Sequence, residues 1–101
     1  MEPISFPINS SADERGKVTF VNDFDMTDVK RSYVVTNKLV KTVRAWHGHR
    51  NEKKWVTVQK GEFLVCVVKV DSFDNPEKNV EVKEYVLNSE NSVLFIPGGY
   101  A

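Results

Sequence analysis

The chain is organised around residues 44–55, which read Arg44-Ala-Trp-His-Gly-His-Arg-Asn-Glu-Lys-Lys-Trp55. This stretch holds two histidines, two arginines, two lysines and two tryptophans. His47 and His49 are separated by one residue, so on a β-strand both rings would point to the same face. Lys54 follows on the same stretch, and Gly61 comes after the next expected strand. Two imidazoles, followed by cations and flanked by aromatic surface, indicate a site for an anionic, ring-shaped substrate.

Short apolar runs on both sides of this stretch predict an all-β fold. The expected strands cover residues 17–22, 29–37, 40–49, 55–59, 63–70, 80–87 and 93–96, with a loop at 71–79. The run at 63–70 is apolar on both faces, which predicts a central strand covered on both sides. No segment shows a sustained helical period, and many short strands favour a sandwich or a barrel. Residues 1–12 contain two prolines and are expected to form an arm that precedes a domain at 13–101.

Composition excludes several classes of protein. The 101 residues suit one small domain, and a formal net charge of zero argues against nucleic-acid binding. No apolar run approaches the roughly 20 residues of a membrane span. The start of the chain lacks the basic and apolar regions of a signal peptide. The single cysteine, Cys66, allows no disulfide within the chain, which fits a reducing compartment. We therefore expect a cytoplasmic protein.

The histidine pair also bears on metal binding. His47, His49, Lys54 and Gly61 keep the spacing of the first cupin motif, which has two histidines one apart, then a glutamate, then a glycine. Lysine stands here where the motif has its metal-binding glutamate, and an ammonium group has no lone pair to give to a metal. Glu52 is two residues out of register. We expect no metal, and a metal-dependent cupin stays open as an alternative.

Six segments, taken in order, resemble the dTDP-4-dehydrorhamnose 3,5-epimerase family and the related dTDP-sugar 3,4-ketoisomerases. They are Asp13-Glu-Arg-Gly16, Arg44-Ala-Trp-His47, Lys54-Trp-Val-x-Val-x-x-Gly61, Val70-Asp71, Leu87-Asn-Ser-Glu-Asn91 and Ile96-Pro-Gly-Gly-Tyr-Ala101. The resemblance implies a cupin-like jelly roll, also called a double-stranded β-helix barrel, that works without metal or redox cofactor. It also implies a homodimer that exchanges N-terminal strands. The family's barrel continues past the segment at 96–101, so we expect a barrel that is incomplete at its C-terminal end.

The resemblance also implies roles for individual residues. His47 matches the base that removes a proton next to a 4-keto carbon, and His49 completes a His-x-His pair typical of the ketoisomerases. Arg15, Arg44 and Lys54 match positions that hold the diphosphate or polarise the keto oxygen. Elementary chemistry agrees, because imidazole is a suitable base near neutral pH and a nearby cation stabilises an enolate. Aromatic faces at Trp46, Tyr33 or Trp55 would suit the thymine.

The expected function is therefore epimerisation or isomerisation of a dTDP-4-keto-6-deoxy sugar, most simply of the 3,5-epimerase type, in deoxysugar supply for surface polysaccharide. A 3,4-ketoisomerase is one alternative. The other is a cupin without catalytic activity that binds a sugar nucleotide or a protein partner.

Overall fold

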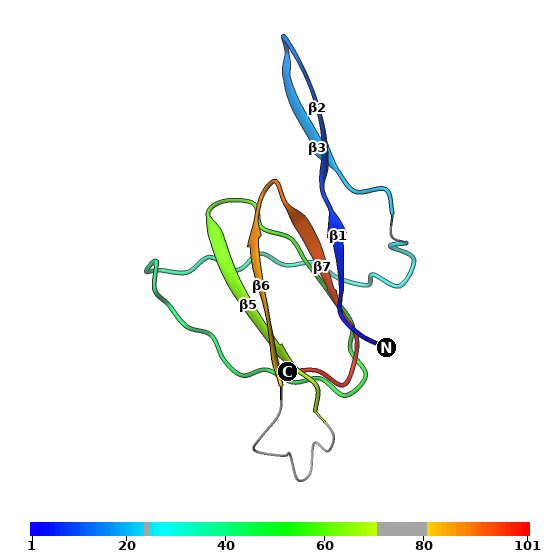
Figure 1. The fold of residues 1–101 in the computed structure, drawn as a ribbon, viewed down its shortest axis with the longest axis vertical. Helices are drawn as coiled ribbons and strands as arrows, with labels where there is room; N and C mark the ends of the chain where they lie inside the picture. Colours follow the sequence, from blue (N-terminus) through cyan, green and yellow to red (C-terminus); the bar gives the residue numbers. More distant parts are fainter. Residues whose placement is uncertain (24, 71–80) are drawn as a thin grey trace.

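The computed structural model describes residues 1–23, 25–70 and 81–101, so the loop expected at 71–79 lies outside the described residues. Every regular element in these ranges is a β-strand, and all strand pairs are antiparallel (Figure 1). The predicted all-β class is therefore confirmed, and the small antiparallel sheets are consistent with a partial cupin-like β fold.

The first layer is a sheet of three strands. It consists of β1 (Ile4–Pro7), β7 (Ser92–Ile96) and β4 (Lys54–Val56), in the order β1-β7-β4. β7 is the central strand, and the backbone of Leu94 is paired with Ser5 on one side and with Val56 on the other. The prolines of the predicted arm do not prevent this pairing, because β1 lies at the edge of its sheet, where a missing N–H is tolerated.

The second layer is the hairpin of β5 (Glu62–Val68) and β6 (Val82–Asn88). Opposite residues of an antiparallel pair share a face, so Phe63 with Leu87 and Val65 with Tyr85 lie on one face. That face packs against Val58, Leu94 and their neighbours from the first layer, and this contact is the hydrophobic core. The core is therefore a two-layer β packing closed by alternate residues of each strand.

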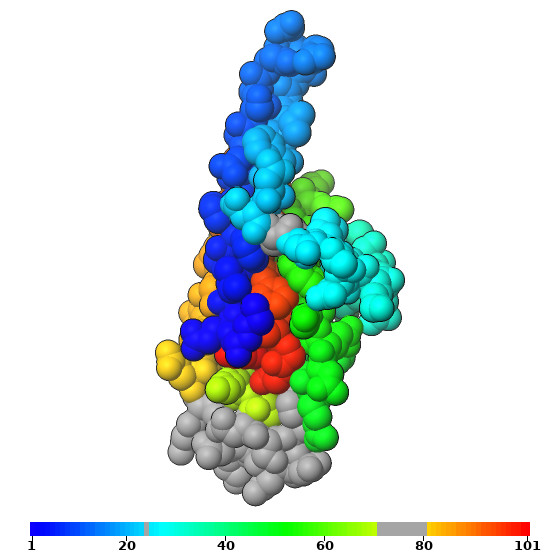
Figure 2. Space-filling view, turned by 90° about the vertical axis from the view of Figure 1, so that its right-hand side faces the viewer, coloured from blue at the N-terminus to red at the C-terminus, as the bar shows by residue number. Residues whose placement is uncertain are grey.

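A third hairpin stands apart from the two layers. β2 (Asn9–Asp13) and β3 (Gly16–Phe20) pair with each other, and all of their residues are exposed. Figures 1 and 2 show this blue hairpin extending away from the body as a narrow finger. Gly16 follows the turn with a φ of 136°, which glycine adopts readily. An ion pair of 2.5 Å between Lys17 and Glu90 links the hairpin to the turn between β6 and β7.

Two predicted strands are wrong. Residues 29–37 form no strand, and of the strand expected at 40–49 only His49 is paired, in an isolated bridge. The apolar side chains of both segments are exposed, including Val34 at 69% and Val40 at 102%. The Val-rich composition favours a strand only where a partner edge accepts the backbone hydrogen bonds. In the part of the chain that the structure describes, no such edge pairs with them. Figure 2 shows the cyan part of this region standing out from the body.

The predicted cover of residues 63–70 is also wrong in part. β5 is a strand, as expected, but it pairs along its length only with β6, and Leu64 on its outer face is 60% exposed. The outer face of β5 is therefore exposed at Leu64, whereas at the C-terminal end of the strand the consecutive residues Val67 and Val68 are both buried. The described chain thus covers both faces of β5 only at that end.

Candidate functional site

Residues 49–54 run antiparallel to residues 96–100, at the end of the first layer. Lys54 is paired with Ile96, and His49 forms an isolated bridge with Tyr100. The two pairs are five positions apart on one segment and four on the other, so the histidine-bearing segment contains one extra residue. We call this one-residue mismatch the bulge, since it resembles a β-bulge in its count, although the chain bends at 50–51 and turns at 98–99.

Gly98 is the residue opposite the bulge. A Cβ atom at this position would lie 2.8 Å from the carbonyl oxygen of Arg50 and 3.0 Å from the carbonyl carbon of Asn51. Both of these are backbone atoms, which cannot move aside as a flexible side chain could. The bulge therefore depends on glycine at position 98.

We expect Gly98→Ala to lower the free energy of unfolding by about 1–3 kcal/mol, because the added methyl group overpacks the bulge. The amide resonance of His49 should shift as well, since its segment must move. Denaturant unfolding followed by NMR would measure both effects. Ser89→Ala, in an exposed turn, is the control and should change stability by no more than about 0.5 kcal/mol. Equal stability of the two variants would contradict the tight packing at Gly98.

The bulge separates His49 from Lys54 along the chain. Lys54 is paired with Ile96, which packs against the core, so Lys54 lies at the end of the first layer. His49 lies five residues earlier and is bridged to Tyr100.

The last residues of the chain connect the two layers at this place. Tyr100 pairs with His49 on one side and with Lys69 on the other, so the three form a cross-strand row. The backbone of Ala101 exchanges two hydrogen bonds of 2.9 Å with Val68. The N–H of Gly99 donates to the His49 carbonyl oxygen at 2.8 Å. The backbone of His49 is thus held in place by the segment at 99–100.

His49 also has a charged neighbour. Its Nδ1 lies 3.0 Å from Oε2 of Glu52, and its side chain is 39% exposed. The other carboxylate oxygen of Glu52 lies 3.6 Å from Nη2 of Arg31. His47, by contrast, is exposed and forms neither an ion pair nor a hydrogen bond with the residues that the structure describes. Of the two histidines, His49 is the one held in a defined environment.

The other predicted binding residues have different immediate neighbours from His49 among the described residues. Arg44 donates from Nε to Oδ1 of Asn37 at 2.7 Å. The ring of Tyr33 lies 5.3 Å from the guanidinium carbon of Arg31. Trp46 is 55% exposed. These three side chains lie along the irregular segment that leads to His49.

Trp55 serves the fold. Its ring lies 5.0 Å from the ring of Phe95, across the pair of β4 and β7. The sequence left this residue open as a ligand contact, and its packing against a buried phenylalanine supports a structural role.

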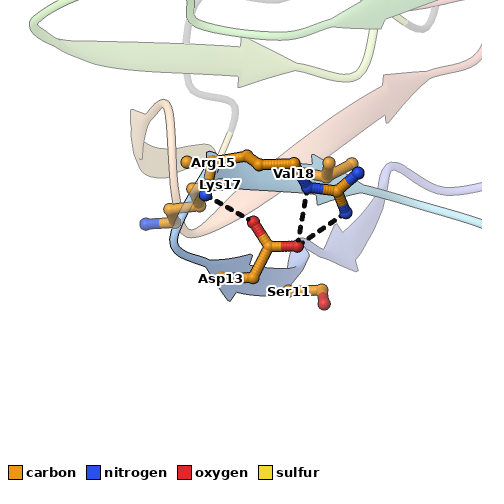
Figure 3. A pocket seen from close by; sticks show the side chains of 6 residues that line it. Ser11, Asp13, Arg15, Lys17 and Val18 are labelled. Atoms are coloured by element: carbon orange, nitrogen blue, oxygen red, sulfur yellow. Dashed lines mark hydrogen bonds and ion pairs between the residues drawn. The ribbon is translucent and has the colours of Figure 1, made fainter.

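Arg15 lies at the tip of the finger formed by β2 and β3, in a shallow hollow lined by Ser11, Asp13, Gly16, Lys17 and Val18 (Figure 3). Its Nη2 lies 2.7 Å from Oδ2 of Asp13, and its backbone N–H donates to Oδ1 at 2.9 Å. Figure 1 shows this tip at the far end of the molecule from the C-terminus, near which His49 lies. Within one chain, Arg15 does not join His49.

The contacts of Arg15 should be visible in a titration of Asp13. The guanidinium hydrogen bond, followed by the backbone hydrogen bond of Arg15, lowers the pKa of Asp13 below the ordinary value of 3.8. Because the folded-state pKa is lowered, the associated stabilisation is present above the unfolded pKa and is lost as pH falls through the folded one. We expect Arg15→Gln to raise the pKa of Asp13, measured by NMR of its carboxyl carbon. Asp25 is the control, because its pKa is lowered by Thr27 and should not respond to Arg15.

Among residues 1–23, 25–70 and 81–101, no group of three or more His, Cys, Asp or Glu side chains is arranged to hold a metal ion. In the same ranges no helix is long and apolar enough to cross a membrane.

Some residues of this site could not be identified from the sequence. Tyr100 was noted only as part of a segment, and Glu52 only as a poor metal ligand, because neither pairing is visible without the register of residues 49–54 against 96–100. Lys69 carried no signal at all. The sequence contained one clue. Ile96-Pro-Gly-Gly-Tyr100 has two adjacent glycines, which allow the backbone of another segment to approach closely.

The fold and the site together define a class: a partial, cupin-like β protein with a histidine held by a bulge at the end of its core. Residues 3–100 match the family described as FdtA: WxcM-like, C-terminal, and the chain belongs to that family. Its domain is a cupin-type domain found in dTDP-sugar isomerases, which supports the broad part of the resemblance drawn from the six segments. No curated protein and no solved structure matches the chain at a significant level.

Proposed function

We propose that this protein isomerises a dTDP-4-keto-6-deoxy sugar by moving the keto group between C4 and C3, with His49 as the base. The family match over residues 3–100 carries the proposal, because it indicates an isomerase-type domain for dTDP-sugars. The surroundings of the two histidines support the choice of base, since His49 has a backbone held by Gly99 and Tyr100 and a carboxylate beside its ring, whereas His47 is exposed. This differs from the resemblance to the epimerases, which favours His47.

The reaction can be written with one base. His49 removes the proton from C3, and the C–H electrons form a C3–C4 double bond while the 4-keto oxygen becomes an oxyanion. The proton of the 3-hydroxyl passes to this oxygen, a keto group forms at C3, and C4 takes the proton back from His49. Lys54, on the same segment as His49, would stabilise the developing oxyanion. One imidazole that acts on one side of the sugar is sufficient for this exchange.

Binding of the nucleotide is the remaining part of the proposal. Arg44 and Arg15 would hold the diphosphate, because guanidinium forks suit phosphate oxygens. Trp46 and Tyr33 expose aromatic faces that would suit thymine. Since Arg15 lies far from His49 in one chain, its role would require a homodimer in which a second copy brings its finger to the site. In this proposal, residues 1–12 are the exchanged arm and 13–101 the domain.

The direct test is proton NMR of dTDP-4-keto-6-deoxyglucose in heavy water with the purified protein. Loss of the C3 proton signal, together with a product whose keto group is at C3, is the expected result. Exchange at both C3 and C5 with the keto group still at C4 would instead indicate a 3,5-epimerase. A folded protein that binds the nucleotide sugar without any exchange would indicate a binding module.

A 3,5-epimerase is the second candidate, and one observation favours it. Asp13-Glu-Arg-Gly16, the start typical of the epimerases, forms a hairpin turn whose arginine is held by Asp13. An epimerase must return the proton on the opposite face of the sugar, so it needs an acid across from the base. Tyr100 lies beside His49 in the same cross-strand row, so it would not supply that acid.

A further inference from the structure

The contact between the side chains of His49 and Glu52 lies in the bulge, and residues from three parts of the chain contribute to it. The backbone of His49 is held by Gly99 and Tyr100, with N···O distances of 2.8 and 3.3 Å. Glu52 follows three residues later and places Oε2 at 3.0 Å from Nδ1 of the imidazole. Arg31, from a distant part of the chain, approaches the other oxygen of the same carboxylate at 3.6 Å. The carboxylate therefore lies between a histidine and an arginine.

The chemistry of this contact decides which nitrogen of His49 can act as a base. An ionised carboxylate can only accept hydrogen bonds, whereas a neutral imidazole has one N–H and one lone pair. If Glu52 faces Nδ1, the favourable tautomer carries its proton on Nδ1 and leaves the lone pair on Nε2. The carboxylate thus decides which nitrogen of the imidazole is available as the base.

We propose that Glu52 is a positioning residue that keeps His49 in the Nδ1–H tautomer, with Nε2 as the atom that removes the sugar proton. The proposal rests on the proposed function for its catalytic consequence, although the tautomer itself is a property of the free protein. Arg31 holds the far side of the Glu52 carboxylate, and the ring of Tyr33 lies 5.3 Å from the Arg31 guanidinium. A role is thereby given to a carboxylate that the sequence analysis considered only as a metal ligand.

A structural explanation of the same contact makes a different prediction. An exposed ion pair contributes little to stability, and both side chains here are about 40% exposed. If Glu52 only supported the bulge, its replacement would alter folding and leave the chemistry of the imidazole unchanged. If Glu52 orients the imidazole, its replacement changes the tautomer and the rate while the fold persists.

The first test needs no substrate. Long-range proton–nitrogen NMR spectra of the protein, labelled with nitrogen-15, report which ring nitrogen of His49 carries the proton, and His49→Gln assigns the signals. We expect the Nδ1–H form in the parent protein and a shift toward the Nε2–H form in Glu52→Gln, whose amide can donate to Nδ1. Glu84→Gln, an exposed glutamate on β6, should leave the His49 signals unchanged. An Nε2–H tautomer in the parent protein, or an unchanged one in Glu52→Gln, overturns the proposal.

The second test uses the exchange reaction. Glu52→Gln should lower the turnover of the sugar nucleotide by about 10²- to 10⁴-fold, because an amide in place of the carboxylate favours the tautomer that has no lone pair on Nε2. KM should change much less than kcat, and Glu52→Asp should recover part of the rate because it restores a carboxylate. Full activity in a folded Glu52→Gln protein overturns the catalytic part. If the parent protein exchanges no protons, the proposed function fails, and the tautomer measurement still decides whether Glu52 orients His49.

Discussion

His49→Gln is expected to lower the rate of proton exchange on a dTDP-4-keto-6-deoxy sugar by about 10²- to 10⁴-fold, the range for loss of a general base. Glutamine keeps most of the side-chain volume and a polar end, but it cannot take up a proton at neutral pH. The site should stay folded, because His49 is held through its backbone by Gly99 and Tyr100. The rate at which the C3 proton signal disappears, followed by proton NMR at saturating substrate, measures the loss.

His47→Gln is the matched control for this experiment. Its imidazole is exposed and has no ion pair or hydrogen bond with the described residues, so a smaller fall in rate is expected. The resemblance to the epimerases makes the opposite prediction, since it assigns the base to His47. If His47→Gln loses more activity than His49→Gln, the base is His47, and the contacts that hold His49 in the bulge do not serve proton transfer. Thermal unfolding of both variants would show that neither loss comes from unfolding.

Leu94→Ala should have the largest effect on stability, a loss of about 2–5 kcal/mol, because the substitution leaves a cavity in the core. Leu94 is 0% exposed and lies on β7, with a paired strand on either side. A domain of this length has a total stability of only about 5–15 kcal/mol, so the variant should be close to unfolding at room temperature. Urea denaturation followed by tryptophan fluorescence measures the change, since Trp55 packs on β7.

Leu64→Ala removes the same number of carbon atoms from a strand of the second layer. Its side chain is 60% exposed on the outer face of β5, so the loss should stay within about 0.5 kcal/mol. Comparable losses in the two variants would mean that the outer face of β5 is covered in solution. Measuring the pair at several protein concentrations would show whether a second copy provides that cover.

The amino-acid sequence by itself determined the class of fold and the positions of several strands. β5, β6 and β7 coincide with apolar runs bounded by turn residues, and the turn at Gly16 was expected from its glycine and its charged neighbours. These signals are local, because a hairpin is formed by residues close together in the chain. The six ordered segments, read as a resemblance, also indicated the dTDP-sugar proteins to which the family match points.

Tertiary structure alone decided which apolar segments became strands. The valines of residues 29–37 have a high preference for strands, but that preference is satisfied only by a neighbouring edge. The described chain offers them none, whereas β1, which contains a proline, pairs with β7 and is included in the first layer. Pairing depends on the spatial arrangement of distant residues, and the composition of one segment does not contain that information.

For the candidate site, too, the sequence determined one part and the tertiary structure another. The sequence placed two histidines and a lysine in one stretch, and their residue types were enough to suggest proton transfer next to a ketone. It predicted that His47 and His49 would share a strand face, and this expectation depended on a regular strand that the structure does not have. One extra residue lies between the pairs Lys54–Ile96 and His49–Tyr100, where the backbone passes close to Gly98, and Tyr100 lies beside His49. A bulge is a mismatch between two segments more than 40 residues apart, so only their pairing in space reveals it.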